Sequence, residues 1–194
     1  MPNRSDDTNY SEPVSRTGRF ASIDRIDRRI SAKCVVRPDG SPRRVAAMSV
    51  LRRVSQSGSY GVGWVVLFAV VVTAIEGWAI ALAAAGSVLG TLMINTVVKE
   101  IVRRPRPAAT AFNDHPTTFS MPSAHTSMAV VGATVMTLVA PALWMLWWAW
   151  TCVLAVSRIV LGMHYIGDVV AGAVFGAVIA RWIVVPVMHA LGVG

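Results

Sequence analysis

A long apolar stretch near the middle of the chain places the tightest limit on how it can fold. Between residues 62 and 98 the only ionisable side chain is Glu76. A single helix over this stretch would be roughly 55 Å long, whereas the hydrocarbon core of a bilayer is about 30 Å thick. The stretch therefore predicts two membrane-spanning helices, at 62–76 and 78–102, with a turn at Glu76 and Gly77.

Three further apolar segments follow a polar loop at 103–121 and predict spans at 123–141, 142–161 and 166–187. We therefore expect an all-α, integral-membrane helical bundle of about five transmembrane helices, occupying residues 61–190. Glycine pairs predict faces for close helix packing in two of the spans, at Gly86 and Gly90 and at Gly172 and Gly176.

Residues 1–60 have a different composition, with twelve of the eighteen Lys and Arg residues and six acidic residues. A basic flank beside apolar spans indicates membrane orientation and contact with anionic lipid, and we expect no nucleic-acid partner. Residues 1–18 are polar and predict a disordered tail. Residues 19–60 form a basic region whose first part has apolar residues at helical spacing: Phe20, Ile23, Ile26 and Ile30. This helix could lie in the membrane interface or pack on the domain, and the sequence leaves both alternatives open.

Three clusters of polar residues interrupt the apolar sequence, at 99–107, 122–125 and 157–168. The second span ends at the first cluster, the third span begins at the second, and the last cluster joins the fourth and fifth spans. With five spans, all three clusters emerge on the same side of the membrane. Ionisable groups beside hydrocarbon are energetically expensive, so their convergence predicts a functional site.

The three clusters together contain groups suited to an anion such as phosphate. Ser123 opens a helix, so its hydroxyl and the first free N–H groups can bind an anion. Lys99, Arg106 and Arg158 add positive charge, and a guanidinium group matches the geometry of phosphate oxygens.

The remaining groups suit nucleophilic and acid–base chemistry. His164 and Asp168 are four residues apart, so the carboxylate can accept the Nδ1 proton and leave Nε2 free as a nucleophile. His125 lies in the first helical turn beside Ser123, where it can act as a general acid. Cys34 and Cys152 form neither a disulfide framework nor a metal site. Each group alone is more often structural, but a structural role does not explain their conjunction on one face of the membrane.

The three clusters contain the following spaced residues: Lys99, six residues, Arg106-Pro107; Pro122-Ser123-Ala124-His125; Ser157-Arg158, five residues, His164, three residues, Asp168. This set resembles the three signature motifs of the type 2 phosphatidic acid phosphatase and vanadium haloperoxidase superfamily. The resemblance covers about residues 60–190 and implies a helical bundle that hydrolyses phosphate esters without a metal or other cofactor. The family commonly has Gly where this chain has Ala124, whose methyl group is expected to narrow the pocket.

By this resemblance, His164 attacks phosphorus and forms a phosphohistidine, while Asp168 orients His164. His125 protonates the leaving group and then activates water. The groups implied to hold the phosphoryl oxygens are Lys99, Arg106, Ser123, the Ala124 backbone N–H and Arg158.

The resemblance implies a multi-pass membrane phosphatase, with residues 61–190 as the phosphatase domain, acting on a lipid-linked phosphomonoester. The Arg-rich composition is compatible with a GC-rich bacterium, and the basic N-terminal region predicts an active site on the cytoplasmic face of its cell membrane. These expectations narrowly favour a polyprenyl-phosphosugar such as decaprenylphosphoryl-5-phosphoribose. Phosphatidylglycerophosphate, phosphatidic acid and polyprenyl diphosphates are alternatives, and a vanadate-dependent oxidase is a more distant one. The sequence leaves the oligomeric state open.

Overall fold

The computed structural model describes residues 19–36, 41–57, 61–107 and 118–193, and within these ranges every regular element is helical. The predicted disordered tail, 1–18, lies outside them. In chain order the elements are α1 (Arg19–Cys34), α2 (Pro42–Ser57), α3 (Val62–Leu67), η2 (Phe68–Val72), α4 (Thr73–Glu76), α5 (Trp78–Val102), α6 (Ala124–Val139), η3 (Pro141–Leu143), α7 (Trp144–Val160), α8 (Ile166–Ile179), η4 (Ala180–Val184) and α9 (Val185–Ala190).

Apolar helices occupy all five predicted span positions. Three are long and apolar enough to cross a membrane, namely Trp78–Val102, Pro141–Val160 and Ile166–Ala190. The other two, Val62–Glu76 and Ala124–Val139, are shorter. Short π-helical turns, η2 and η4, lie within the first and last of these helices. The predicted all-α membrane bundle is confirmed.

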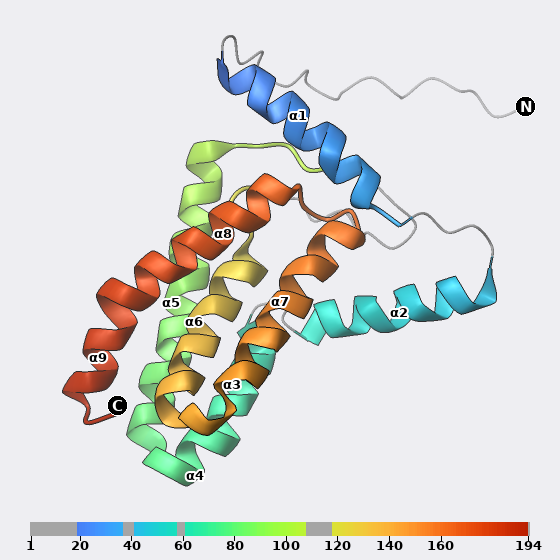
Figure 1. Ribbon diagram of the computed structural model, residues 1–194. Helices are drawn as coiled ribbons and strands as arrows, with labels where there is room; N and C mark the ends of the chain where they lie inside the picture. Colours follow the sequence, from blue (N-terminus) through green and yellow to red (C-terminus); the bar gives the residue numbers. More distant parts are fainter. Residues whose placement is uncertain (1–18, 37–40, 58–60, 108–117, 194) are drawn as a thin grey trace, which may run out of the picture.

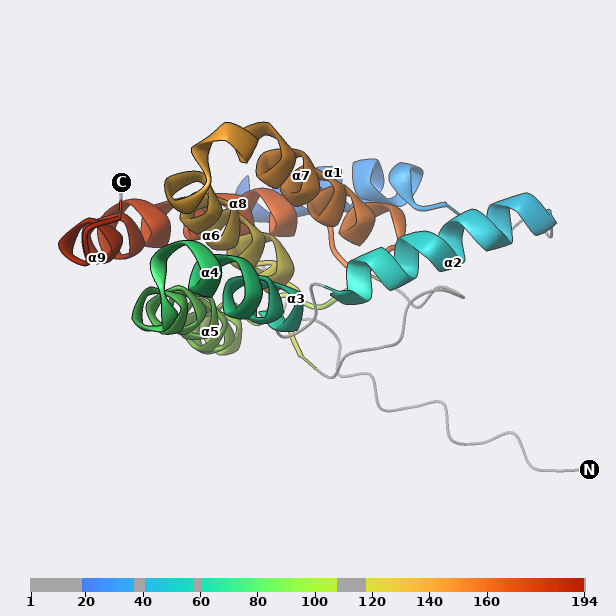
Figure 2. The same ribbon diagram turned by 90° about the horizontal axis from the view of Figure 1, so that it is seen from below.

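Helix α6 is the central element of the bundle and packs against α5, α7 and α8 (Figure 2). Its contact with α8 is close because α8 presents glycine. A Cβ atom added at Gly172 would lie 2.5 Å from the Ser123 carbonyl oxygen, and one at Gly176 would lie 2.6 Å from that of Ser127. By contrast, a Cβ atom at Gly86 or Gly90 would meet nothing within 4 Å, so the glycine face predicted on α5 packs against no described residue.

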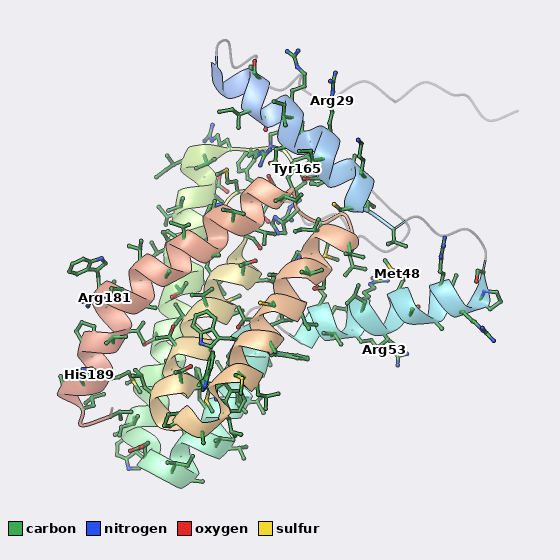
Figure 3. All side chains as sticks on the ribbon, in the orientation of Figure 1. Arg29, Met48, Arg53, Tyr165, Arg181 and His189 are labelled. Atoms are coloured by element: carbon green, nitrogen blue, oxygen red, sulfur yellow. The ribbon has the colours of Figure 1, made fainter. Side chains whose placement is uncertain are left out.

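The two N-terminal helices lie outside the bundle and contact one end of it. Helix α1 crosses the end where α5 and α7 finish and α8 begins (Figure 1). It packs on the domain, yet its isoleucines, Ile23, Ile26 and Ile30, remain half or more exposed. Helix α2 projects sideways, and its Met48 packs against Leu161 and Met163 just beyond the end of α7 (Figure 3).

Candidate active site

The structure gathers the predicted site residues at the end of the bundle that α1 crosses. They come from the last turn of α5, the loop after it, the start of α6, the last turn of α7 and the connection into α8. His125 lies in the first turn of α6, directly after Ser123 and Ala124. Five of the predicted residues are at most 6% exposed, namely Lys99, Ser123, Arg158, His164 and Asp168.

Arg106 braces the loop after α5 against the connection between α7 and α8. Its Nε and Nη2 atoms donate to the carbonyl and hydroxyl oxygens of Thr118, at 2.7 and 2.9 Å. Its Nη1 donates to the Met163 carbonyl at 3.1 Å and lies 3.3 Å from His164 Nε2. A guanidinium group has donors only, so this contact requires His164 Nε2 to accept and places the imidazole proton on Nδ1.

The buried imidazole of His164 is held neutral. Burial is the largest cause, with contributions from Arg158 and Arg106, and the nearby Asp168 acts in the opposite direction. The net effect lowers the pKa of His164 to about 3. The backbone of the connection is fixed as well, because the N–H groups of Met163 and His164 both donate to the Arg158 carbonyl, at 3.0 and 3.2 Å. His164 therefore presents an unprotonated Nε2 at ordinary pH.

Asp168 lies beside His164, as the four-residue spacing predicts. The distance from His164 Nδ1 to Asp168 Oδ2 is 3.5 Å, longer than an ordinary hydrogen bond, and Nδ1 is buried without a hydrogen-bond partner. The same Oδ2 accepts the Tyr165 N–H at 3.0 Å. The two side chains are thus in contact, and a small rotation of the imidazole would complete the hydrogen bond.

Ser123 joins the start of α6 to α8. Its N–H donates to the Asp168 backbone carbonyl at 2.9 Å, and its own carbonyl accepts from the Ser127 N–H and hydroxyl, both at 3.0 Å. The Ser123 side chain does not cap α6, and its hydroxyl accepts from Thr126 Oγ1 at 3.1 Å. The first N–H groups of α6, beginning with Ala124, have no acceptor within the helix, which suits them to an anion.

Sequence reasoning missed a second arginine of the first cluster. Arg104 is only 6% exposed, and its Nη1 donates to Asp168 Oδ1 at 2.7 Å. Its Nη2 donates to Asp24 at 2.6 Å and Asp27 at 2.8 Å, both on α1. The sequence pattern that could have predicted this contact is the spacing of Asp24, Asp27 and Ser31, which puts three polar groups on one helical face.

A second missed contact comes from α2. Arg158 Nη1 donates to the hydroxyl of Ser55 at 2.7 Å, and Ser55 is fully buried. This bond fixes one edge of the Arg158 guanidinium, and no sequence pattern indicated it.

Within the described ranges, no group of three or more His, Cys, Asp and Glu side chains could hold a metal ion. Metal-independent hydrolysis itself stays a prediction.

Comparisons with known proteins identify the family to which the chain belongs. Residues 77–190 match the model of the PAP2 superfamily. The decaprenylphosphoryl-5-phosphoribose phosphatases of two Mycobacterium tuberculosis strains, CDC 1551 / Oshkosh and ATCC 25618 / H37Rv, are each 31% identical over 153 residues, covering 70% of this chain and 78% of theirs. The crystal structure of a transmembrane PAP2-type phosphatidylglycerolphosphate phosphatase from Bacillus subtilis is similar in fold, with a TM-score of 0.67 and 22% identity over 82% of this chain and 83% of that one. The family inferred from the three motifs is confirmed, and the chain belongs to the PAP2 superfamily.

Proposed function

We propose that this membrane phosphatase hydrolyses a lipid-linked phosphomonoester through a phosphohistidine at His164. The main support for this proposal is the tautomer of the His164 imidazole. Its Nε2 accepts from Arg106 at 3.3 Å, and its Nδ1 faces the Asp168 carboxylate. This is the tautomer that a nitrogen nucleophile needs. The adjacent Arg106 guanidinium can donate its hydrogen bonds to a phosphoryl oxygen once substrate is bound.

The reaction proceeds in two displacements at phosphorus. In the first, the His164 Nε2 lone pair forms an N–P bond while the ester P–O bond breaks, and protonated His125 gives its proton to the leaving oxygen. In the second, neutral His125 takes a proton from water as the water oxygen attacks phosphorus, the N–P bond breaks, and phosphate leaves. Asp168 stabilises the positive charge that the His164 ring gains.

Hydrogen-bond donors near these residues hold the phosphoryl oxygens. Phosphoryl transfer needs mainly positioning and charge neutralisation. The holding groups are Lys99, Arg106, Ser123, the Ala124 N–H and Arg158. Hydrolysis by this route needs no metal.

Two variants test the mechanism in purified protein. His164→Ala should abolish turnover and phosphoenzyme formation. His125→Ala should be slow with a lipid alkoxide leaving group but should still become phosphorylated by an aryl phosphate, whose leaving group needs no acid. Activity should persist in EDTA and fall with vanadate, a mimic of five-coordinate phosphorus. Full turnover by His164→Ala, or loss of activity in EDTA, contradicts the mechanism.

For the substrate we propose a polyprenyl-phosphosugar of the decaprenylphosphoryl-5-phosphoribose type. The support is the 31% identity to the two mycobacterial phosphatases named for that compound, since the Bacillus subtilis likeness concerns fold alone. An apolar pocket of about 370 Å³ between α3 and α7 offers room for part of a hydrocarbon chain, and Leu154 in its wall lies one turn before Arg158.

The substrate assay compares phosphate release from the polyprenyl phosphoribose, phosphatidylglycerophosphate, phosphatidic acid and a polyprenyl diphosphate in one detergent. We expect the highest kcat/KM with the phosphoribose. A clear preference for a glycerolipid would overturn the proposed substrate but not the proposed phosphohistidine mechanism.

We also propose that the site faces the cytoplasm of a bacterial cell and that α1 lies in the membrane interface. The support is that α1, from the Arg-rich region, sits at the site end with its isoleucines exposed, so the basic flank and the site share one side. Cys34, on α1, is exposed and reports the side. In a Cys152→Ser variant, an impermeant thiol reagent should label Cys34 only after the cells are opened, and Cys34→Ser is the matched blank. Labelling of Cys34 in intact cells would contradict the proposed orientation and indicate the opposite one.

A further inference from the structure

The first turn of α8, which carries Asp168, is held from outside the bundle by α1. The Ser31 hydroxyl accepts the Ile166 N–H at 2.9 Å, and the Asp27 carboxylate accepts the Gly167 N–H at 3.1 and 3.2 Å. These are N–H groups that a helix cannot satisfy internally. Ser31 Oγ also donates to Asp27 at 3.2 Å, which fixes the two side chains to each other. Helix α1 therefore supplies acceptors for the first two N–H groups of α8.

Arg104 links this α1 surface to Asp168. Its guanidinium divides its donors, with Nη1 on Asp168 Oδ1 at 2.7 Å and Nη2 on Asp24 and Asp27. The guanidinium carbon also lies over the face of the Tyr165 ring, 4.5 Å from its centre, so the ring stabilises its position. Ser120 fixes the backbone, because its N–H and hydroxyl both donate to the Arg104 carbonyl, at 2.8 and 3.1 Å.

The division of the Arg104 donors matters for the His164–Asp168 pair. A guanidinium beside a single carboxylate tends to bind both of its oxygens. Here the α1 carboxylates hold Nη2, so Arg104 takes only Oδ1 of Asp168, and Oδ2 is left facing His164 Nδ1 at 3.5 Å. Without Asp27, Nη2 keeps only Asp24, whose side chain is about one-third exposed, and the guanidinium is expected to turn toward both oxygens of Asp168 and to compete with the imidazole.

We propose that Asp27 and Arg104 are positioning residues for phosphoryl transfer, and that α1 acts through Arg104 to hold the Asp168 carboxylate toward His164. This inference rests on the proposed function, because it needs His164 as the nucleophile. It assigns a role to Asp27, on a helix that precedes the first span, and to Arg104, which lies within the first cluster but is not one of the residues that define the motif.

The test measures kcat and KM for Asp27→Asn and Arg104→Lys with the lipid phosphate that the substrate assay selects. Asn keeps the shape of Asp27 but loses its charge, and Lys lacks the second set of donors. We expect kcat to fall about 10- to 100-fold and KM to change less than about twofold, because misplacing a catalytic group affects the chemical step. Arg29→Gln is the matched control on the same helix, since Arg29 is exposed and points away from the bundle, and it should behave as the wild type (Figure 3).

A double-mutant cycle separates positioning from simple stabilisation. If Asp27 acts through Asp168, then Asp27→Asn should change kcat less than about twofold in an Asp168→Asn background. An equal fold-loss in both backgrounds, or wild-type kcat for Asp27→Asn and Arg104→Lys, overturns the proposal. If Asp27→Asn does not fold, Arg104→Lys is carried through the same cycle. Full turnover by His164→Ala overturns the proposed function and this role together, whereas inactive His164→Ala with unaffected positioning variants overturns this role alone.

Discussion

A single methyl group at Gly172 should disturb the site from within the helix packing. In Gly172→Ala the new Cβ atom would lie 2.5 Å from the Ser123 carbonyl oxygen and 3.1 Å from the Ser123 nitrogen. Ordinary contact begins near 3.4 Å, so α6 and α8 must separate there by about 0.9 Å, the difference between 3.4 and 2.5 Å. The hydrogen bond from the Ser123 N–H to the Asp168 carbonyl, 2.9 Å long in the wild type, joins the same two helices and should stretch or break.

This displacement moves the proposed phosphate-binding end of α6 away from the proposed nucleophile. Overpacking of this kind typically costs about 1–3 kcal/mol of stability, and a shift near 1 Å in a catalytic group can lower the rate about 100-fold. We therefore expect Gly172→Ala to melt at a lower temperature in detergent and to lose 10- to 100-fold in kcat. Both quantities are measured on the same purified sample.

Two other glycines serve as controls. Gly176→Ala brings its Cβ atom to 2.6 Å from the Ser127 carbonyl, one turn farther from the site, so it should lose similar stability but less kcat. Gly86→Ala meets nothing within 4 Å and should be neutral or slightly more stable, since Ala favours a helix over Gly by about 1 kcal/mol. Wild-type kcat in Gly172→Ala, or a kcat that falls no further than that of Gly176→Ala, would show that this helix contact does not position the site.

Three further predictions concern single groups. Ser55→Ala removes the acceptor of Arg158 Nη1, and we expect a several-fold rise in KM in steady-state kinetics; an unchanged KM would show that Ser55 does not hold Arg158 for the substrate. Because burial lowers the pKa of His164 to about 3, the unfolded chain binds a proton below pH ~6.5 that the folded chain does not. Stability should therefore fall as pH drops from about 6.5 toward 3, and melting curves at pH 5 and 7.5 should show a smaller decrease for His164→Gln. An Asp24→Asn variant should lose less kcat than Asp27→Asn, because Asp24 is about one-third exposed and does not contact α8 backbone groups, and the same kinetic assay ranks the two.

The sequence predicts the bundle well because hydropathy decides it. Each long apolar segment becomes a helix, and the turn at Gly77 follows from the one acidic residue in the first apolar stretch. The gathering of Lys99, Ser123 and His164 follows from counting spans, which needs no knowledge of packing angles.

The contacts of α1 and α2 could not be predicted in the same way. The bond between Arg104 and Asp24 joins residues 80 positions apart, and the one between Arg158 and Ser55 joins residues 103 apart. Both depend on how α1 and α2 dock on the end of the bundle, and neither hydropathy nor motif spacing specifies the docking angle. The same limit applies to Gly86 and Gly90, whose small-residue pattern matches that of Gly172 and Gly176 although no neighbour approaches them in the described structure.

The docking of α1 has a consequence for how the protein can be shortened or recombined. The family match begins at residue 77, and a fragment cut there would lack α1, α2 and the first apolar helix. Arg104 would then lose Asp24 and Asp27, and two N–H groups of α8 would lose their acceptors. The smallest portion of the chain that retains this site therefore extends back to α1. In chimaeras with relatives, Arg104 and the α1 carboxylates have to be exchanged as one unit.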